Sequence, residues 1–144
     1  MRAATELDPR DAAARLVAEH DGPWVSSFAA ELERRLGGRD LDRIMRRWNL
    51  SRGELGELFG VSRQAVSKWI VGGIPAERTE QVADVSAITD LLERHLKRDR
   101  IAAVVRRRAP GLGGASLIDL VGAGRSRDAL RLTREMFTFT DAHS

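Results

Sequence analysis

Apolar residues recur every three or four positions along nearly the whole chain, which is the spacing of one face of a helix. Strict strand alternation is absent, and so are Asn-Gly or Asp-Gly turns flanked by such strands. The pattern therefore predicts an all-α protein. A first helix should open at Asp8, an N-cap acid that precedes Pro9, and should end at Asp21-Gly22-Pro23.

A second helix is expected to begin at Trp24 and to stop at Gly37-Gly38, since glycines commonly end helices. A third should run from Asp40 through Trp48. The apolar positions of the second helix fall at helical spacing. They are Val25, Phe28, Ala29, Leu32 and Leu36.

Two short helices are predicted next, joined by a tight turn. Ser51 and Glu54 form a capping box that starts a helix ending at Phe59. Gly60 breaks it, and Ser62 caps a second helix over residues 63–70, which the turn at residues 72–75 closes.

The remaining pattern predicts one long helix from 76 to about 97, which the basic segment after it either restarts or continues. A loop at 110–114 should precede a short helix at 116–121 and a last helix from Ser126 to about Met136. The predicted domains are an N-terminal helical extension (1–38), a helix-turn-helix domain (39–75), a linking helix (76–97) and a C-terminal helical domain (98–144).

Length and composition narrow the class of protein. A chain of 144 residues fits one domain or two small ones. It holds no apolar run near the roughly 20 residues that cross a bilayer, and its first residues lack the hydrophobic segment of a secretory signal. We expect a cytoplasmic protein with no membrane partner.

Catalytic and metal chemistry is disfavoured by the residue types. Cysteine is absent, and His20, His95 and His143 are far apart in the sequence. The glycine-rich segments at 111–114 and 122–124 lack the lysine and the preceding strand of phosphate-binding loops. Asp84, Asp90 and Glu93 should be solvated on a polar helix. The expectation is no enzyme, no metal and no cofactor.

Charge is distributed unevenly, although the net charge is only +3. Residues 41–70 carry six basic and three acidic groups, and residues 97–108 carry six basic and one acidic group. Localised positive charge attracts a phosphate backbone. The abundance of arginine also has a simpler explanation, a GC-rich coding bias.

Residues 55–69 carry the most specific motif. Two short helices that cross steeply need a small residue at the contact and a residue that tolerates positive φ at the turn. Gly56 and Gly60 supply these, and apolar residues hold the second helix on the first: Leu55, Phe59, Val61, Val66 and Trp69. The segment resembles the DNA-binding domain of the lambda-repressor/Cro-like family over roughly residues 39–75.

That resemblance implies a partner, double-stranded DNA, whose major groove would receive the second helix. Arginine can pair with guanine and glutamine with adenine, whereas Val66 and Trp69 should point inward. The alternative is an ordinary solvated helical hairpin. The expected DNA-contacting residues are Arg52, Ser62, Arg63, Gln64, Ser67 and Lys68.

In the C-terminal half, the segment 104–114 ends in Leu112-Gly113-Gly114 and is followed by a helix from Ser116 to Val121 and a helix from Ser126. This order resembles the toxin-binding domain of Xre/MbcA/ParS-type antitoxins. The resemblance extends over about 100 residues, with Val104 where the family usually has tryptophan. The family implies binding of a RES-domain toxin that consumes NAD, occlusion of its active-site cleft by the antitoxin's C-terminal end, and repression of the promoter.

On that basis the partner surface is predicted on the last helix and tail, because exposed aromatics and methionine often anchor interfaces. The alternative is that the apolar members pack on the domain's own core. The predicted set is Arg131, Leu132, Arg134, Met136, Phe137 and Phe139. Truncation from about Arg125 should then abolish the complex and spare the helix-turn-helix.

A second basic patch offers a competing function. Some actinobacteriophage immunity repressors are similar in plan, pairing a helix-turn-helix with a second DNA-binding helical domain. Three consecutive arginines also suit a helix C-terminus, where the dipole favours cations. The patch comprises Lys97, Arg98, Arg100, Arg106, Arg107 and Arg108. A homodimer and the role of Trp24, Phe28 and Leu32 stay open.

Overall fold

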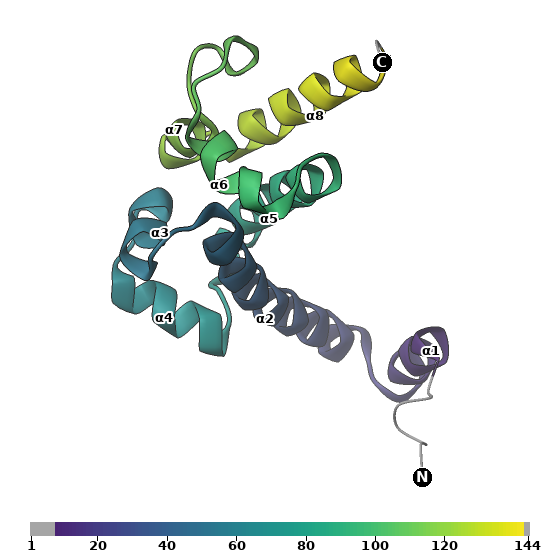
Figure 1. Ribbon diagram of the computed structural model, residues 1–144. Helices are drawn as coiled ribbons and strands as arrows, with labels where there is room; N and C mark the ends of the chain where they lie inside the picture. Colours follow the sequence, from purple (N-terminus) through teal and green to yellow (C-terminus); the bar gives the residue numbers. More distant parts are fainter. Residues whose placement is uncertain (1–7, 143–144) are drawn as a thin grey trace. The chain divides into compact units, whose positions relative to one another are not determined.

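The computed structural model describes residues 8–142, and every regular element within them is helical, which confirms the all-α class (Figure 1). The chain divides into two compact units between Glu33 and Arg34. The elements in chain order are α1 (Pro9–Glu19), α2 (Gly22–Trp48), α3 (Arg52–Phe59), α4 (Arg63–Gly72), the 3-10 turn η1 (Ala76–Arg78), α5 (Thr79–His95), α6 (Arg98–Arg106), the 3-10 turn η2 (Pro110–Leu112), α7 (Leu117–Gly122) and α8 (Ser126–Ala142).

The N-terminal unit contains α1 and the first part of α2. Asp8 caps α1 as predicted, because its carboxylate accepts a hydrogen bond of 2.7 Å from the backbone amide of Arg10. Not one of residues 8–33 is buried. Trp24, Phe28 and Leu32 are all exposed, and the rings of Trp24 and Phe28 stack with centroids 5.3 Å apart. Residues 8–33 therefore contribute no buried hydrophobic core.

The predicted stop at Gly37-Gly38 is wrong, because α2 continues through both glycines to Trp48. Both glycines are buried. A Cβ on Gly37 would overlap the side chain of Ile74, and one on Gly38 would overlap the carbonyl oxygen of Trp69. The glycines therefore allow the end of α4 to approach α2 closely, and packing outweighs their low helix propensity.

The segment from α3 to α4 follows the sequence prediction closely. Ser51 and Glu54 form the capping box, with the Ser51 Oγ accepting from the Glu54 amide at 3.1 Å. Gly60 ends α3 in the left-handed conformation at φ 71°. A Cβ on Gly56 would lie 2.6 Å from the carbonyl oxygen of Val61, so only glycine fits where the turn crosses α3.

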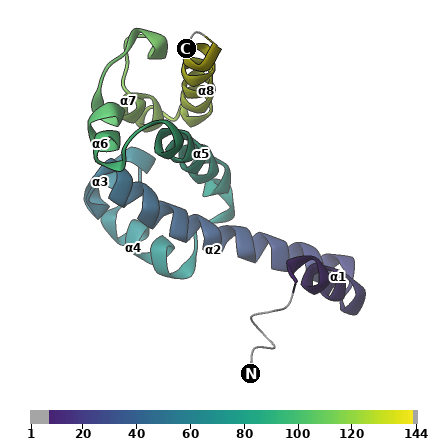
Figure 2. The ribbon, with the colours of Figure 1, turned by 45° about the vertical axis from the view of Figure 1, so that its right-hand side comes forward.

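The predicted helix from 76 to about 97 is present, and the basic segment after it restarts as a new helix, which is one of the two alternatives expected. The predicted helix starts as η1, continues as α5 and ends at Leu96, after which α6 begins at Arg98. The last helix is longer than predicted and reaches Ala142. Figures 1 and 2 both show α8 lying alongside α5, and the two helices pack against each other.

One hydrophobic core runs through the second unit. It includes Ile44 and Trp48 of α2, Val66 of α4, Ile88 of α5 and Ala129 of α8. The indole of Trp48 is fully buried and donates to the hydroxyl of Thr89 at 3.0 Å, which joins α2 to α5. Helix α5 is therefore a central element of this core. It also connects the predicted domains 39–75 and 98–144, whose boundaries stay a prediction.

Within residues 8–142, no helix combines the length with the apolar character that a bilayer crossing requires.

Candidate DNA and partner interfaces

Helix α4 presents polar side chains to solvent at its N-terminal end. The hydroxyl of Ser62 accepts a hydrogen bond from the Ala65 amide at 3.1 Å and so fixes the start of the helix. Arg63, Gln64 and Lys68 are exposed and make no side-chain hydrogen bond or ion pair with the described part of the chain. Their donors and acceptors are available to a ligand.

The inward side of α4 matches the expectation in part. Val66 is fully buried in the core. Trp69 is only half-buried, and the guanidinium of Arg78 lies 5.9 Å from its ring centroid. Trp69 also lines an open hollow beside α4 together with Gln64 and Lys68. Part of this indole therefore lies on the same side as the polar residues.

Arg52 joins this surface from the neighbouring helix. It is the first residue of α3, and its guanidinium donates to the hydroxyl of Ser67 at 2.8 Å. The bond links the predicted α3 and α4 contact residues directly. With Arg63 and Lys68, the surface carries three exposed cations.

The second basic patch is not one continuous cluster of free cations. Arg106 is committed to backbone carbonyls of Trp48 at 2.7 Å, Asn49 at 2.9 Å and Ala102 at 2.6 Å. Arg108 lies 3.9 Å from the carboxylate of Asp119.

The other members of the patch are exposed but separated along α6. Lys97, Arg98 and Arg100 lie at its start, and Arg107 caps its end. A rise of 1.5 Å per residue puts roughly 12 Å between the first and last residues of this helix. The six predicted cations therefore do not share one environment.

The predicted partner residues on α8 divide into two groups. Leu132 and Phe137 are half-buried against the core, and the Phe137 ring stacks on His95 with centroids 4.1 Å apart. Met136 and Phe139 are more exposed, at 37% and 65%. Packing on the chain's own core thus explains Leu132 and Phe137, whereas Phe139 has most of its ring in solvent.

The charged members of that set lie on the outer side of α8. Arg131 forms ion pairs with Glu135 at 3.2 Å and Asp128 at 3.6 Å, and Arg134 is exposed. These arginines form a polar margin beside the apolar residues of the helix.

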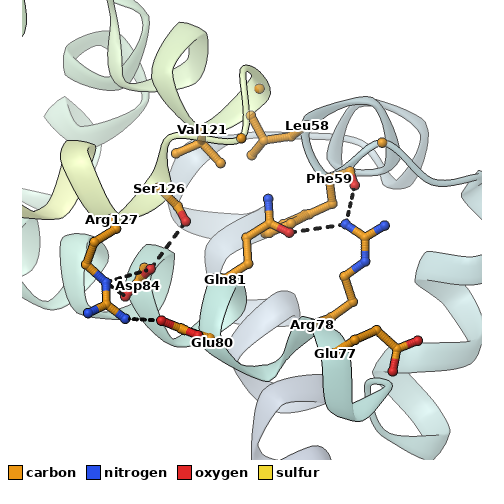
Figure 3. Close-up of a pocket in the computed structure, with 13 residues that line it drawn as sticks. Leu58, Phe59, Glu77, Arg78, Glu80, Gln81, Asp84, Val121, Ser126 and Arg127 are labelled. Carbon is orange, nitrogen blue, oxygen red and sulfur yellow. Dashed lines mark hydrogen bonds and ion pairs between the residues drawn. The ribbon is translucent and has the colours of Figure 1, made fainter.

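A pocket of about 450 Å³ with polar and apolar walls lies between α3, η1, α5, α7 and the start of α8 (Figure 3). Asp84 was expected to be solvated, but it is only 7% exposed and lies between Ser126 and Arg127. The Ser126 hydroxyl and the Arg127 guanidinium each donate to its carboxylate at 3.3 Å, and Arg127 also pairs with Glu80. Arg78 crosses the same pocket and donates to the Phe59 carbonyl at 2.8 Å.

The other two acids of α5 are paired with α2. The Arg43 guanidinium donates to Asp90 at 2.8 Å and to Glu93 at 2.5 Å, and Arg47 donates to Glu93 at 3.2 Å. Burial raises the pKa of Glu93, but the hydrogen bonds from Arg43 and Arg47 outweigh it and hold the pKa below its ordinary value. Burial raises the pKa of Asp40, which Arg43 opposes.

Each of these acids of α5 therefore forms at least one ion pair with an arginine of α2 or α8. No group of three or more histidine or acidic side chains among residues 8–142 could hold a metal, and His143 lies outside the described residues. The glycines at 113, 114 and 124 have positive φ, which explains why glycine is used there.

No protein-family model and no curated protein matches this chain. A similar solved structure is the crystal structure of the M. tuberculosis MbcT-MbcA toxin-antitoxin complex. The similarity covers 69% of this chain and 91% of one chain of the complex, with a TM-score of 0.56 and 22% identity. The two chains share a fold.

Three features escaped the sequence interpretation. The burial of Asp84 and the commitment of Arg106 both depend on helices distant in sequence. An apolar pocket beside α8 has no local signal in the chain, because its lining residues come from α5, α6, η2, α7 and α8. The regular spacing of Arg43 and Arg47 opposite the acids of α5 was a signal that could have indicated the ion pairs.

Proposed function

We propose that the protein is a DNA-binding antitoxin that represses its own promoter and neutralises a RES-type toxin. The observation that carries the proposal is the fold that this chain shares with one chain of a toxin-antitoxin complex. The similarity covers 91% of that one chain. The protein itself performs no catalysis and needs no cofactor in this proposal.

DNA recognition is assigned to α4. Its exposed Arg63 and Gln64 would read base edges, while Ser62, Ser67 and Lys68 contact a base or the backbone. Arg52 supports this from α3 through its bond to Ser67. The availability of the α4 donors supports a ligand on this face, since their amide and guanidinium groups are not used within the described chain.

Toxin binding is assigned to α8. Exposed Met136 and Phe139 supply apolar contact area, and Arg131 and Arg134 supply charge at its margin. Leu132 and Phe137 would contribute by holding the helix on the core.

Mild affinity purification of the tagged chain from its native host, with nuclease treatment, tests this proposal. The expected result is one stoichiometric small protein that is toxic when expressed alone. A parallel preparation without nuclease should retain one promoter sequence. A bare protein in the first preparation contradicts the antitoxin function.

A stand-alone repressor with a second DNA-binding region is the alternative, favoured by the exposed cations Lys97, Arg98 and Arg100. It needs no protein partner. Replacing these three residues by glutamine should then weaken DNA affinity and flatten its dependence on salt. Unchanged DNA affinity, together with a captured toxin, excludes this alternative.

A homodimer is a further part of the proposal. Symmetric dimers read palindromic operators, and a symmetric interface must be self-complementary. The exposed face of Trp24, Phe28 and Leu32 is apolar, and no residue of the described segment 8–33 is buried. Sedimentation equilibrium should show a dimer that the substitutions Trp24→Ser and Phe28→Ser dissociate. A wild-type monomer at micromolar concentration contradicts it.

A further inference from the structure

We propose that the apolar pocket beside α8 receives one aromatic side chain of the protein partner, and that a carboxylate adjacent to that side chain pairs with Arg107. The inference rests on the proposed function, since that assigns the partner to α8. The inference adds the contact that anchors the partner and the groups that the partner must carry, an aromatic side chain and an adjacent carboxylate.

The pocket has a volume of about 220 Å³ and lies between α5, α6, the segment 107–117 and α8. Its walls are almost wholly apolar. Thr133 and Arg107 are the polar residues of the lining, and the Thr133 hydroxyl already donates to the Ala129 carbonyl at 2.7 Å. The apolar wall residues are Leu92, Val104, Ala109, Leu112, Leu117, Met136 and Phe137.

The size of the pocket suits a side chain better than a metabolite. Small-molecule sites usually span about 300–1,000 Å³, whereas an apolar cavity of roughly 150 Å³ accommodates a benzene molecule. A pocket of about 220 Å³ therefore has room for one aromatic ring and little else. Empty apolar space is costly in a packed interior, so an occupant of this size gains dispersion contacts on every wall.

Arg107 gives the pocket its chemical preference, because it is the one charged residue of the lining. Its neighbours are committed elsewhere, Arg106 to backbone carbonyls and Arg108 beside Asp119. The exposed Arg107 side chain makes no hydrogen bond or ion pair within the described residues. A carboxylate next to the inserted ring would satisfy this guanidinium through a charge-assisted hydrogen bond.

The direct test is an NMR titration of the ¹⁵N-labelled full chain with two probes, N-acetyl-phenylalanine and its uncharged amide. Both probes should saturate and shift the amides of Thr133, Met136 and Phe137, with the acid binding more tightly. Arg107→Gln should weaken the acid about three- to tenfold and leave the amide unchanged. Arg108→Gln is the matched control and should change neither.

Val104→Phe fills the pocket from α6 and should abolish the binding of both probes while the melting temperature is held or raised. Equal effects of the two arginine substitutions, or probe binding that survives Val104→Phe, would overturn the inference.

The same variants separate this inference from the proposed function. A toxin whose affinity is unaffected by Val104→Phe and Arg107→Gln overturns the pocket as its anchor site and leaves the antitoxin function standing. Specific probe binding in a chain that captures no toxin supports the pocket chemistry and contradicts only the proposed function. If the wild-type chain self-associates and Val104→Phe abolishes that self-association, the occupant of the pocket is a second copy of this chain. That result would overturn the inference of a different protein partner.

Discussion

Arg106 closes the end of α2 by donating to the carbonyl oxygen of Trp48, 58 residues earlier in the chain. A second donor of the same guanidinium reaches the carbonyl of Asn49 at 2.9 Å. The last carbonyls of a helix have no partner within that helix, so a charged donor is valuable there. The residue that the sequence suggested as a phosphate contact is used to join α6 to α2.

Arg106→Ala should therefore lower the free energy of unfolding by about 1–3 kcal/mol, the usual contribution of hydrogen bonds to a charged donor. Urea unfolding followed by circular dichroism measures it. Arg98→Ala is the control, because that exposed side chain has no partner in the described chain and should change stability by less than about 0.5 kcal/mol. Equal changes in unfolding free energy for Arg106→Ala and Arg98→Ala would contradict the structural role of Arg106.

Gly38→Ala should destabilise the protein although alanine favours helices. The new Cβ would overlap the carbonyl oxygen of Trp69, and overpacking typically costs about 1–3 kcal/mol. Gly53→Ala is the matched control in α3, where a Cβ would come no closer than 3.9 Å to the Ser51 hydroxyl. Thermal melts should show a lower midpoint for the first variant and an equal or higher midpoint for the second.

Glu93 should make stability depend on pH in the acidic range. Its pKa is lower in the folded state than in the unfolded chain, so the unfolded state takes up a proton first as pH falls. The stabilisation is complete above the ordinary glutamate pKa and is lost as pH falls through the lower folded value. The raised pKa of Asp40 acts in the opposite direction.

Urea titrations of wild type and Glu93→Gln from pH 7 to pH 3 measure this effect. The difference in unfolding free energy should be largest near neutrality and should shrink as the pH falls. Glu57→Gln, at an exposed position, is the control. A difference that stays constant with pH would contradict the role assigned to the Arg43 and Arg47 hydrogen bonds.

Base reading by α4 has a distinct signature. Arg63→Ala or Gln64→Ala should reduce discrimination at one base pair by about 1–3 kcal/mol for each lost contact. Lys68→Ala should instead weaken binding to all sequences if that residue meets a phosphate. Competition binding at fixed salt measures both. Unchanged sequence preference in the first two variants would show that α4 does not read bases.

Removal of residues 125–144 was expected to spare the helix-turn-helix, and the shared core changes that expectation. The deletion removes Ala129 and Leu130 from the core and uncovers the face of α5 that packs against α8. Exposing that apolar surface to water lowers the stability of the rest of the core. We now expect the truncated chain to melt at a much lower temperature. An unchanged melting temperature would show that the α3–α4 region is stable by itself.

Local sequence signals predicted the elements that depend on local interactions. The Ser51–Glu54 capping box, the Ser62 cap and the left-handed Gly60 all involve residues a few positions apart, and each is present in the structure. The all-α class followed from apolar periodicity for the same reason.

Predictions failed where distant segments decide the outcome. Gly37 and Gly38 suggested a helix end, but contact with the end of α4 makes them interior helical residues. The burial of Asp84 equally depends on packing between elements. Periodicity shows that a face is apolar and does not show which element covers it.

The continuous core that includes both Val66 and Ala129 couples the lifetimes of the two proposed activities. Cooperative units open as a whole, so a protease that unravels α8 also exposes the chain that supports α4. A single degradation event in the cell would then release the promoter and the toxin together. Unfolding of α4 or α8 alone could therefore not end DNA binding without also ending toxin binding, or the reverse.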